Sequence, residues 1–124
     1  MPIQNSARLR EREIVMIKET YATFDEFWLD FLRAHSKPGT RAFHYAGMLA
    51  ALWLGVMFAM SGQGYLLVLA ILAPYVLGFA SHALVEHNKP VSLKHPVYSV
   101  RGAVQMFVLW AIGRLGPELA KAGV

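Results

Sequence analysis

The sequence predicts an all-α fold: a small polytopic membrane helical bundle built on an antiparallel transmembrane hairpin. The chain has 124 residues, which is enough for a single domain. Hydrophobic residues make up 56% of it and charged residues only 16%, whereas an ordinary soluble domain is about one quarter charged. From Ala42 to Val85 there is no Asp, Glu, Lys or Arg. This uncharged stretch of 44 residues is close to two bilayer crossings of about 20 residues each plus a short turn.

The uncharged stretch is expected to form two membrane helices, over residues 40–60 and 65–87. Its only cluster of small and polar residues, Ser61-Gly62-Gln63-Gly64, lies between them and predicts a tight turn. Pro74 should kink the second helix. The alternative is a soluble bundle that buries the hairpin, but the rest of the chain is short for covering two apolar helices.

A third membrane helix is expected over residues 96–115. Pro96 suits a first helical position, where the missing N–H is not needed. Arg101 and Arg114 lie near the two ends of the segment, so a full crossing requires both side chains to extend toward the interface.

Before the hairpin, residues 1–17 are expected to form a charged N-terminal arm and residues 18–34 an amphipathic helix at the membrane interface. Thr23 and Glu26 form a capping-box pattern that opens the run Phe27–Ala34 of this second segment. No signal peptide is expected, because no hydrophobic stretch follows the first charged residues.

The charges predict orientation and exclude several classes of protein. From His35 onward there are seven basic residues and two acidic ones, and the basic residues flank the hairpin while its turn is neutral. The positive-inside rule therefore places the turn outside and the basic ends in the cytoplasm, in a bacterial inner membrane or the endoplasmic reticulum. This distribution is typical of membrane loops and not of a nucleic-acid surface. With no cysteine, disulfide scaffolds, thiolate metal sites and cysteine nucleophiles are excluded.

The histidines are expected to gather at one level of the bundle. His44 and His82 each lie 19 residues from the hairpin midpoint near residue 63, so both should lie about 28 Å from the turn. The remaining histidines border the same end of the hairpin. Imidazole binds Fe, Zn, Cu and Ni alike, so this level is a candidate metal site, with purely structural polar contacts as the alternative. The five histidines are His35, His44, His82, His87 and His95.

Two parts of the chain resemble a known family. The first runs from His35 to Gly47 as HSKPGTRAFHYAG, and the second combines SHALVEHNKP from Ser81 with HPVYS from His95. Together they resemble the small membrane 2-hydroxy-fatty-acid dioxygenases, whose fungal members act in the α-oxidation branch of phytosphingosine breakdown. The resemblance extends from about Phe27 to Leu115.

The resemblance implies an iron(II)-dependent dioxygenase that shortens a long-chain 2-hydroxy fatty acid by one carbon, using O₂ and releasing CO₂. His35, His44 and His82 stand at its motif positions as metal ligands, and Asn88, Lys89 and Pro90 match the motif as well. Glu86 matches too, and it shares a helix face with His82 at i,i+4. It is expected either to bind the metal or to orient an imidazole. His87 and His95 are further ligand candidates.

A 2-hydroxy acid can chelate a metal through its hydroxyl and carboxylate oxygens, which requires open positions on the metal. Arg41, Lys89 and Arg101 are expected at the same level and are candidates for binding the substrate carboxylate, with lipid-phosphate anchoring as their alternative role. The acyl tail is expected to run along the hairpin past Trp53, Tyr75 and Phe79.

Two functions of other classes remain open from the sequence. His44 and His82 could be axial ligands of one haem b in a membrane electron carrier. A non-enzymatic membrane module would use its apolar helices to bind a partner and its histidines only as interfacial residues. The expected partners are the fatty acid, O₂ and the lipid bilayer, with no nucleic acid, and the short third helix leaves room for a homodimer.

Overall fold

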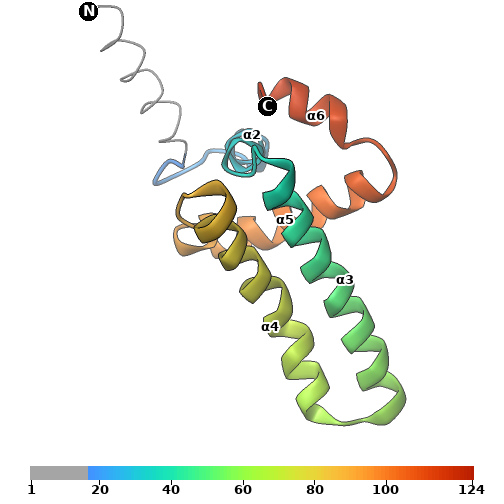
Figure 1. Ribbon diagram of the computed structural model, residues 1–124. Helices are drawn as coiled ribbons and strands as arrows, with labels where there is room; N and C mark the ends of the chain where they lie inside the picture. Colours follow the sequence, from blue (N-terminus) through green and yellow to red (C-terminus); the bar gives the residue numbers. More distant parts are fainter. Residues whose placement is uncertain (1–16) are drawn as a thin grey trace, which may run out of the picture.

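The computed structural model describes residues 17–124 and shows an all-helical chain, with no strand in that part (Figure 1). The predicted N-terminal arm, residues 1–17, lies outside the described residues except for its last one. Five α-helices, one π-helical turn and one 3₁₀ turn follow in the order α2 (Phe24–Ala34), α3 (Pro38–Ser61), α4 (Gly64–Ser81), η1 (His82–Glu86), η2 (Val91–Leu93), α5 (Pro96–Ala111) and α6 (Leu115–Lys121).

Helices α3 and α4 form the antiparallel hairpin that the uncharged stretch predicts. The turn lies at the predicted place. Gly62 adopts a left-handed conformation with φ of +69° and donates its N–H to the Phe58 carbonyl at 2.7 Å, which ends α3. The second predicted helix, residues 65–87, is divided, because the α-helix ends at Ser81 and continues as the π-helical turn.

The hairpin is packed closely only at the end away from its turn, which is called the closed end below; the half nearer the turn is called the open end. A Cβ on Gly47 would lie 2.9 Å from the Pro74 Cα, so the backbones of α3 and α4 touch at this level. Toward the turn, large apolar side chains point away from the protein, for example Trp53 at 68% exposure and Met60 at 84%. The rest of the described chain therefore leaves this half of the hairpin uncovered. Two helical segments, Pro38–Ser61 and Gly64–Glu86, are long and apolar enough to cross a membrane.

Helix α2 is shorter than the predicted segment 18–34 and begins at Phe24. Thr23 has extended backbone angles, and its Oγ1 accepts a hydrogen bond from the Glu26 N–H at 3.4 Å, which is an N-cap. The apolar face of α2 packs against α5 and α6, so within the protein it is already covered and its predicted interfacial role is not confirmed.

Helix α5 is also shorter than predicted. It ends at Ala111, and a turn with Gly113 at φ of +72° leads into α6, whereas the expected helix extended to Leu115. In Figure 1 α5 runs across the closed end of the hairpin and not along its length. A third membrane span is therefore not confirmed by the described helices.

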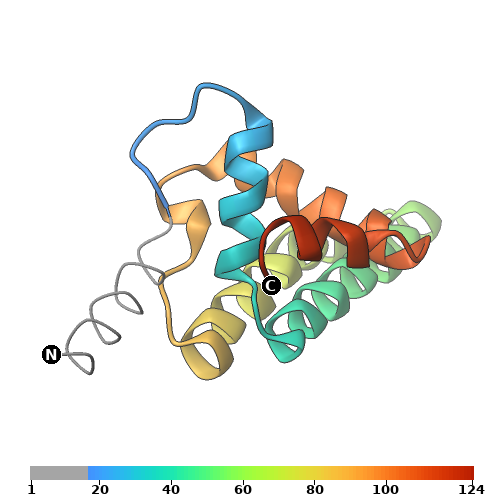
Figure 2. The same ribbon diagram turned by 90° about the horizontal axis from the view of Figure 1, so that it is seen from above.

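The closed end has an aromatic core in which Phe27, Phe31 and Leu32 of α2 are at most 2% exposed. Seen from above, α2 has α6 on one side and the segment after α4 on the other (Figure 2). Arg33 donates to the Ala122 carbonyl on the α6 side at 2.9 Å. Asn88 donates to the Ala34 carbonyl on the other side at 3.0 Å. Helix α2 is thus hydrogen-bonded both to the C-terminal end of α6 and to the loop that follows η1.

Candidate metal centre

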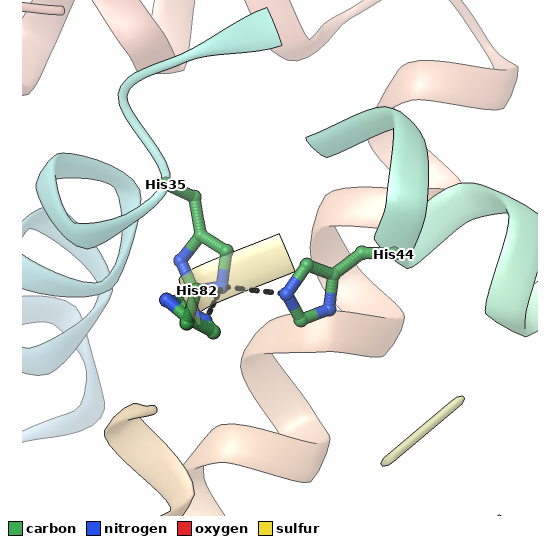
Figure 3. Close-up of side chains that lie close together, drawn as sticks. All are labelled: His35, His44 and His82. Atoms are coloured by element: carbon green, nitrogen blue, oxygen red, sulfur yellow. Dashed lines mark hydrogen bonds between the residues drawn. The ribbon is translucent and has the colours of Figure 1, made fainter. Parts of the chain in front are cut away.

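Three histidines from three separate segments meet at the closed end of the hairpin. His35 follows α2, His44 lies in the second turn of α3, and His82 begins the π-helical turn after α4. The Nε2 atom of His35 lies 3.1 Å from the Nε2 atoms of both other rings, and Figure 3 shows the three side chains converging. One potential ligand atom from each ring lies within 4.8 Å of the others.

The end of α2 positions His35. As the residue that caps this helix, His35 donates its backbone N–H to the Leu32 carbonyl at 3.0 Å, and its Nδ1 lies 2.6 Å from the Phe31 carbonyl. The Phe31 ring packs against the imidazole in a tilted arrangement, with 4.1 Å between ring centroids. Arg41 holds the same residue from the other side, through a hydrogen bond from Nη1 to the His35 carbonyl at 2.8 Å. His35 is only 1% exposed, so its ring has little freedom to turn.

The loop after the π-helical turn positions His82. His87 adopts the left-handed conformation with φ of 59° and ends the turn, its N–H bonding to the His82 carbonyl. The chain then reverses, and the Asn88 N–H also donates to the His82 carbonyl at 3.0 Å. This brings the Asn88 Oδ1 to 2.6 Å from His82 Nδ1. Asn88 thus connects the ring of His82 to the end of α2.

A glycine on the facing helix makes room for His44. A Cβ on Gly78 would lie 2.9 Å from the Cε1 of His44 and 3.5 Å from its Nε2. Any larger residue at position 78 would push the imidazole away from the other two. Gly78 is therefore a positioning residue for the cluster.

Two of the three imidazoles have their tautomer set by a partner. The Phe31 carbonyl can only accept, so the proton of a neutral His35 is on Nδ1. Asn88 points its Nδ2 at the Ala34 carbonyl, so its Oδ1 faces His82 and the proton of that ring is also on Nδ1. Each ring then presents an unprotonated Nε2, and these two atoms are 3.1 Å apart. Two lone pairs at this distance repel each other unless a cation is shared between them.

Burial makes a proton a poor candidate for that cation. It lowers the pKa of His35 well below the usual 6.5, and the neighbouring rings of His44 and His82 lower it further. A metal ion fits the donor set better, because it binds neutral imidazoles. Two nitrogens that each lie about 2.1 Å from one metal are about 3.0 to 3.4 Å apart, which matches the observed 3.1 Å.

The carboxylate of Glu86 lies away from the three rings and binds the start of α3. It accepts hydrogen bonds from the Lys37 N–H at 3.1 Å, from the Thr40 hydroxyl at 2.6 Å and from the Ser36 hydroxyl. The prediction placed Glu86 on the His82 face because it assumed α-helical spacing. A π-helical turn is wider, so a residue four positions on is rotated to another side. The structure thus gives Glu86 the role of holding η1 against α3.

The two other histidines lie outside the cluster. His87 is exposed at the end of the π-helical turn. His95 packs against the rings of Tyr21 and Phe27, and its Nε2 lies 2.7 Å from the Lys18 carbonyl. Among the described residues, the three clustered histidines form the one group with metal-binding geometry.

The three predicted carboxylate-binding cations lie at the same end of the protein but at different distances from the cluster. Arg41 contacts the His35 backbone directly, as described above. The Arg101 guanidinium stacks over the Phe24 ring at 3.9 Å, and Lys89 is exposed on the loop after η1. None of the three lines the cavity that opens beside the histidines.

That cavity has a volume of about 290 Å³ and begins at the three histidines. From there it continues between α3, α4 and α5 along apolar side chains. Tyr75 and Phe79 line it as predicted for an acyl tail, whereas Trp53 does not. Ser99, 7% exposed, also lines it, and the Ser99 hydroxyl has no hydrogen-bond partner among the described residues. The site thus joins a cluster that could hold a metal ion to an apolar cavity.

Comparison with models of known protein families shows which family the chain belongs to. The family model described as 2-hydroxy-palmitic acid dioxygenase Mpo1-like matches residues 21–115, which contain all three clustered histidines and all of the cavity-lining residues. The chain belongs to the Mpo1-like family. No curated protein and no solved structure matches it. This membership confirms the resemblance that the sequence motifs indicated. The family is named for a dioxygenase activity.

The site of this Mpo1-like protein does not have the geometry of a bis-histidine haem. The two axial ligands of a haem lie on opposite faces of the macrocycle, so the macrocycle fills the space around their ligand nitrogens and keeps other side chains away from both. Here His35 Nε2 is 3.1 Å from the Nε2 atoms of both His44 and His82, where the macrocycle would have to lie. The cluster therefore favours a single small ion.

Several residues of the site were not predicted from the sequence. Asn88 was visible as part of the motif, but nothing in the spacing shows that it orients His82. The Phe31 carbonyl lies four residues before His35, and this i−4 relation was the available signal. Gly78 and Ser99 act through tertiary contacts that only the packed hairpin and α5 create.

Proposed function

We propose that this Mpo1-like protein is an iron(II)-dependent dioxygenase that shortens long-chain 2-hydroxy fatty acids by one carbon. The overall reaction converts RCH(OH)COOH and O₂ into RCOOH, CO₂ and H₂O. The observation that carries the proposal is the cluster of His35, His44 and His82 at the mouth of an apolar cavity, in a chain that belongs to a family named as dioxygenases.

The metal is proposed to be iron because the reaction needs a redox-active ion. Zn²⁺ also binds three histidines but has no redox chemistry, so it cannot activate O₂. Iron(II), bound by the three imidazoles, would supply O₂ activation and leave positions open for a chelating 2-hydroxy acid. The protein supplies the three neutral Nε2 donors, two of them fixed by Phe31 and Asn88.

The substrate is proposed to bind with its polar end at the histidines and its tail in the cavity. The apolar walls exclude water from the reacting carbon and match the chemistry of an acyl chain. The Ser99 hydroxyl can turn about one bond to donate to the substrate's polar end, which would satisfy a group that is otherwise buried without a partner. None of the three cations expected to bind the carboxylate lines the cavity, and Arg41 is proposed instead to hold the backbone of His35 in place.

The protein is proposed to lie in a membrane, with α3 and α4 crossing it and the histidines at the cytoplasmic face. The support is the length and apolar surface of the two helices together with the basic residues at the closed end. An insoluble fatty acid would then reach the cavity from the lipid without passing through water.

The test is turnover of 2-hydroxypalmitate by detergent-purified protein supplied with Fe(II) in air, with pentadecanoic acid and CO₂ as the measured products. His35→Ala, His44→Ala and His82→Ala should each lower kcat by at least about 100-fold. His87→Asn is the matched control, because the residue is exposed and asparagine tolerates a positive φ.

Two results would overturn the proposal. One is a folded wild-type protein that forms no shortened acid with Fe(II) present. The other is a purified protein with a Soret band, which would indicate the haem alternative.

A further inference from the structure

The register of the hairpin places two alanines opposite each other one turn below the closest backbone contact. Gly47 on α3 meets Pro74 on α4, and His44 meets Gly78. In an antiparallel pair, four residues further along one helix correspond to four residues back along the other. Ala51 is therefore opposite Ala70, and both line the cavity.

The lining of the cavity ends at the Ala51–Ala70 level, and no residue of the next turn of the hairpin lines it. There the register places Gly55 opposite Leu66, which is 5% exposed and is not among the cavity-lining residues. Leu66 lies one turn from Ala70 on the same face of α4, so a large buried side chain lies just beyond the cavity. The cavity has small residues at the Ala51–Ala70 level and a leucine immediately below, so this level is its floor.

The depth of the cavity follows from helix geometry. Ala51 is seven residues beyond His44, which corresponds to about 10 Å along α3 at 1.5 Å per residue. An extended chain advances about 1.2 Å per bond, which follows from about 3.6 Å per three-bond residue. About eight or nine bonds of an acyl tail therefore fit between the histidines and the floor, so the end of a longer tail, such as that of 2-hydroxypalmitate, has to extend past the Ala51–Ala70 level toward Leu66.

We propose that Ala51, Ala70 and Leu66 determine the acyl chain length that the enzyme prefers. The inference rests on the proposed function, since it takes the polar end of the substrate to lie at the three histidines. A tail that reaches the floor contacts Ala51 and Ala70, and a longer tail meets Leu66. Side-chain size at this level then selects the substrate, far from the metal and without altering it.

Two substitutions should change the preference in opposite directions. Ala70→Leu raises the floor, so the optimum should become about two carbons shorter. Leu66→Ala opens the next turn, which adds about 5 Å and should make the optimum about four carbons longer. Leu67→Ala is the matched control, because this neighbouring leucine is 42% exposed and lies outside the cavity.

The experiment measures kcat/KM for a series of 2-hydroxy acids of about ten to eighteen carbons with each variant. The ratio between a long and a short substrate is the readout, because it does not depend on how much of a variant is folded. One methylene in an apolar site changes kcat/KM by about tenfold or more, so Ala70→Leu should change the long-to-short ratio at least tenfold. The Leu67→Ala ratio should equal that of the wild type.

The outcomes separate this inference from the proposed function. If all variants are active with an unchanged chain-length profile, the tail does not reach the floor and the inference is wrong. If the wild-type protein turns over none of the acids, the proposed function itself fails.

Discussion

The two ends of the α3–α4 hairpin have similar apolar sequences but different surroundings. At the closed end, Gly47 touches Pro74, and α2 and α5 cover the polar atoms of the histidines. At the open end, a Cβ on Gly55 would meet nothing within 4 Å, and Trp53 and Met60 point outward. The difference teaches that hydrophobicity alone does not locate a core. At one end the hairpin packs against α2 and α5, and three imidazoles are held together there. At the other end its apolar side chains are exposed and need an apolar surrounding such as lipid.

The largest expected effect comes from placing a charge on the open end. Leu72 is 48% exposed near the middle of α4, and Leu72→Asp should weaken membrane insertion by about 3 kcal/mol, because a carboxylate is poorly tolerated in the hydrocarbon centre. The measurement is the fraction of protein that stays in the membrane after alkaline washing. Gln63→Asp in the turn is the control and should behave like the wild type. Equal membrane retention of the two variants would show that the open end is not in lipid.

Alanine substitution of one glycine at each end of the hairpin tests the difference in packing directly. Gly47→Ala forces a Cβ against the Pro74 backbone and should lower the free energy of unfolding by about 1–3 kcal/mol. Gly55→Ala meets open space, so it should leave stability unchanged or raise it by up to about 1 kcal/mol through better helix propensity. Thermal unfolding in detergent measures both. Equal losses of stability in the two variants would contradict the difference in packing.

A smaller effect is expected from the residue that orients His82. Asn88→Ala removes the acceptor for the His82 Nδ1–H and should weaken metal binding by at least about tenfold, or about 1.4 kcal/mol. Metal titration of the purified protein measures this, with Lys89→Ala as the control on the same loop. Wild-type affinity in the Asn88 variant would show that the ring does not need this partner.

Much of this architecture could be predicted from the sequence, because segments that lie in lipid or in a packed core carry no charged residues and so stand out in the sequence. The uncharged stretch predicted the hairpin, and equal spacing from its turn predicted that His44 and His82 meet. The spacing could not predict the π-helical turn after α4, which rotates Glu86 toward Thr40 and brings Asn88 to His82. The capping box at Thr23 was visible in the sequence and marks the start of α2, although the predicted segment 18–34 began earlier. The predicted third helix extended past the glycine turn at Gly113, where α5 has already ended.

Metal analysis tests the central claim most directly. Wild-type protein reconstituted with Fe(II) without oxygen and freed of excess metal should hold about one ion per chain, because one ligand atom of each of the three histidines lies within 4.8 Å of the others. His35→Ala should hold almost none while His87→Asn keeps the full amount. An unchanged iron content in the His35 variant would show that the imidazole in contact with both other rings is not a ligand, and the proposed centre would be contradicted.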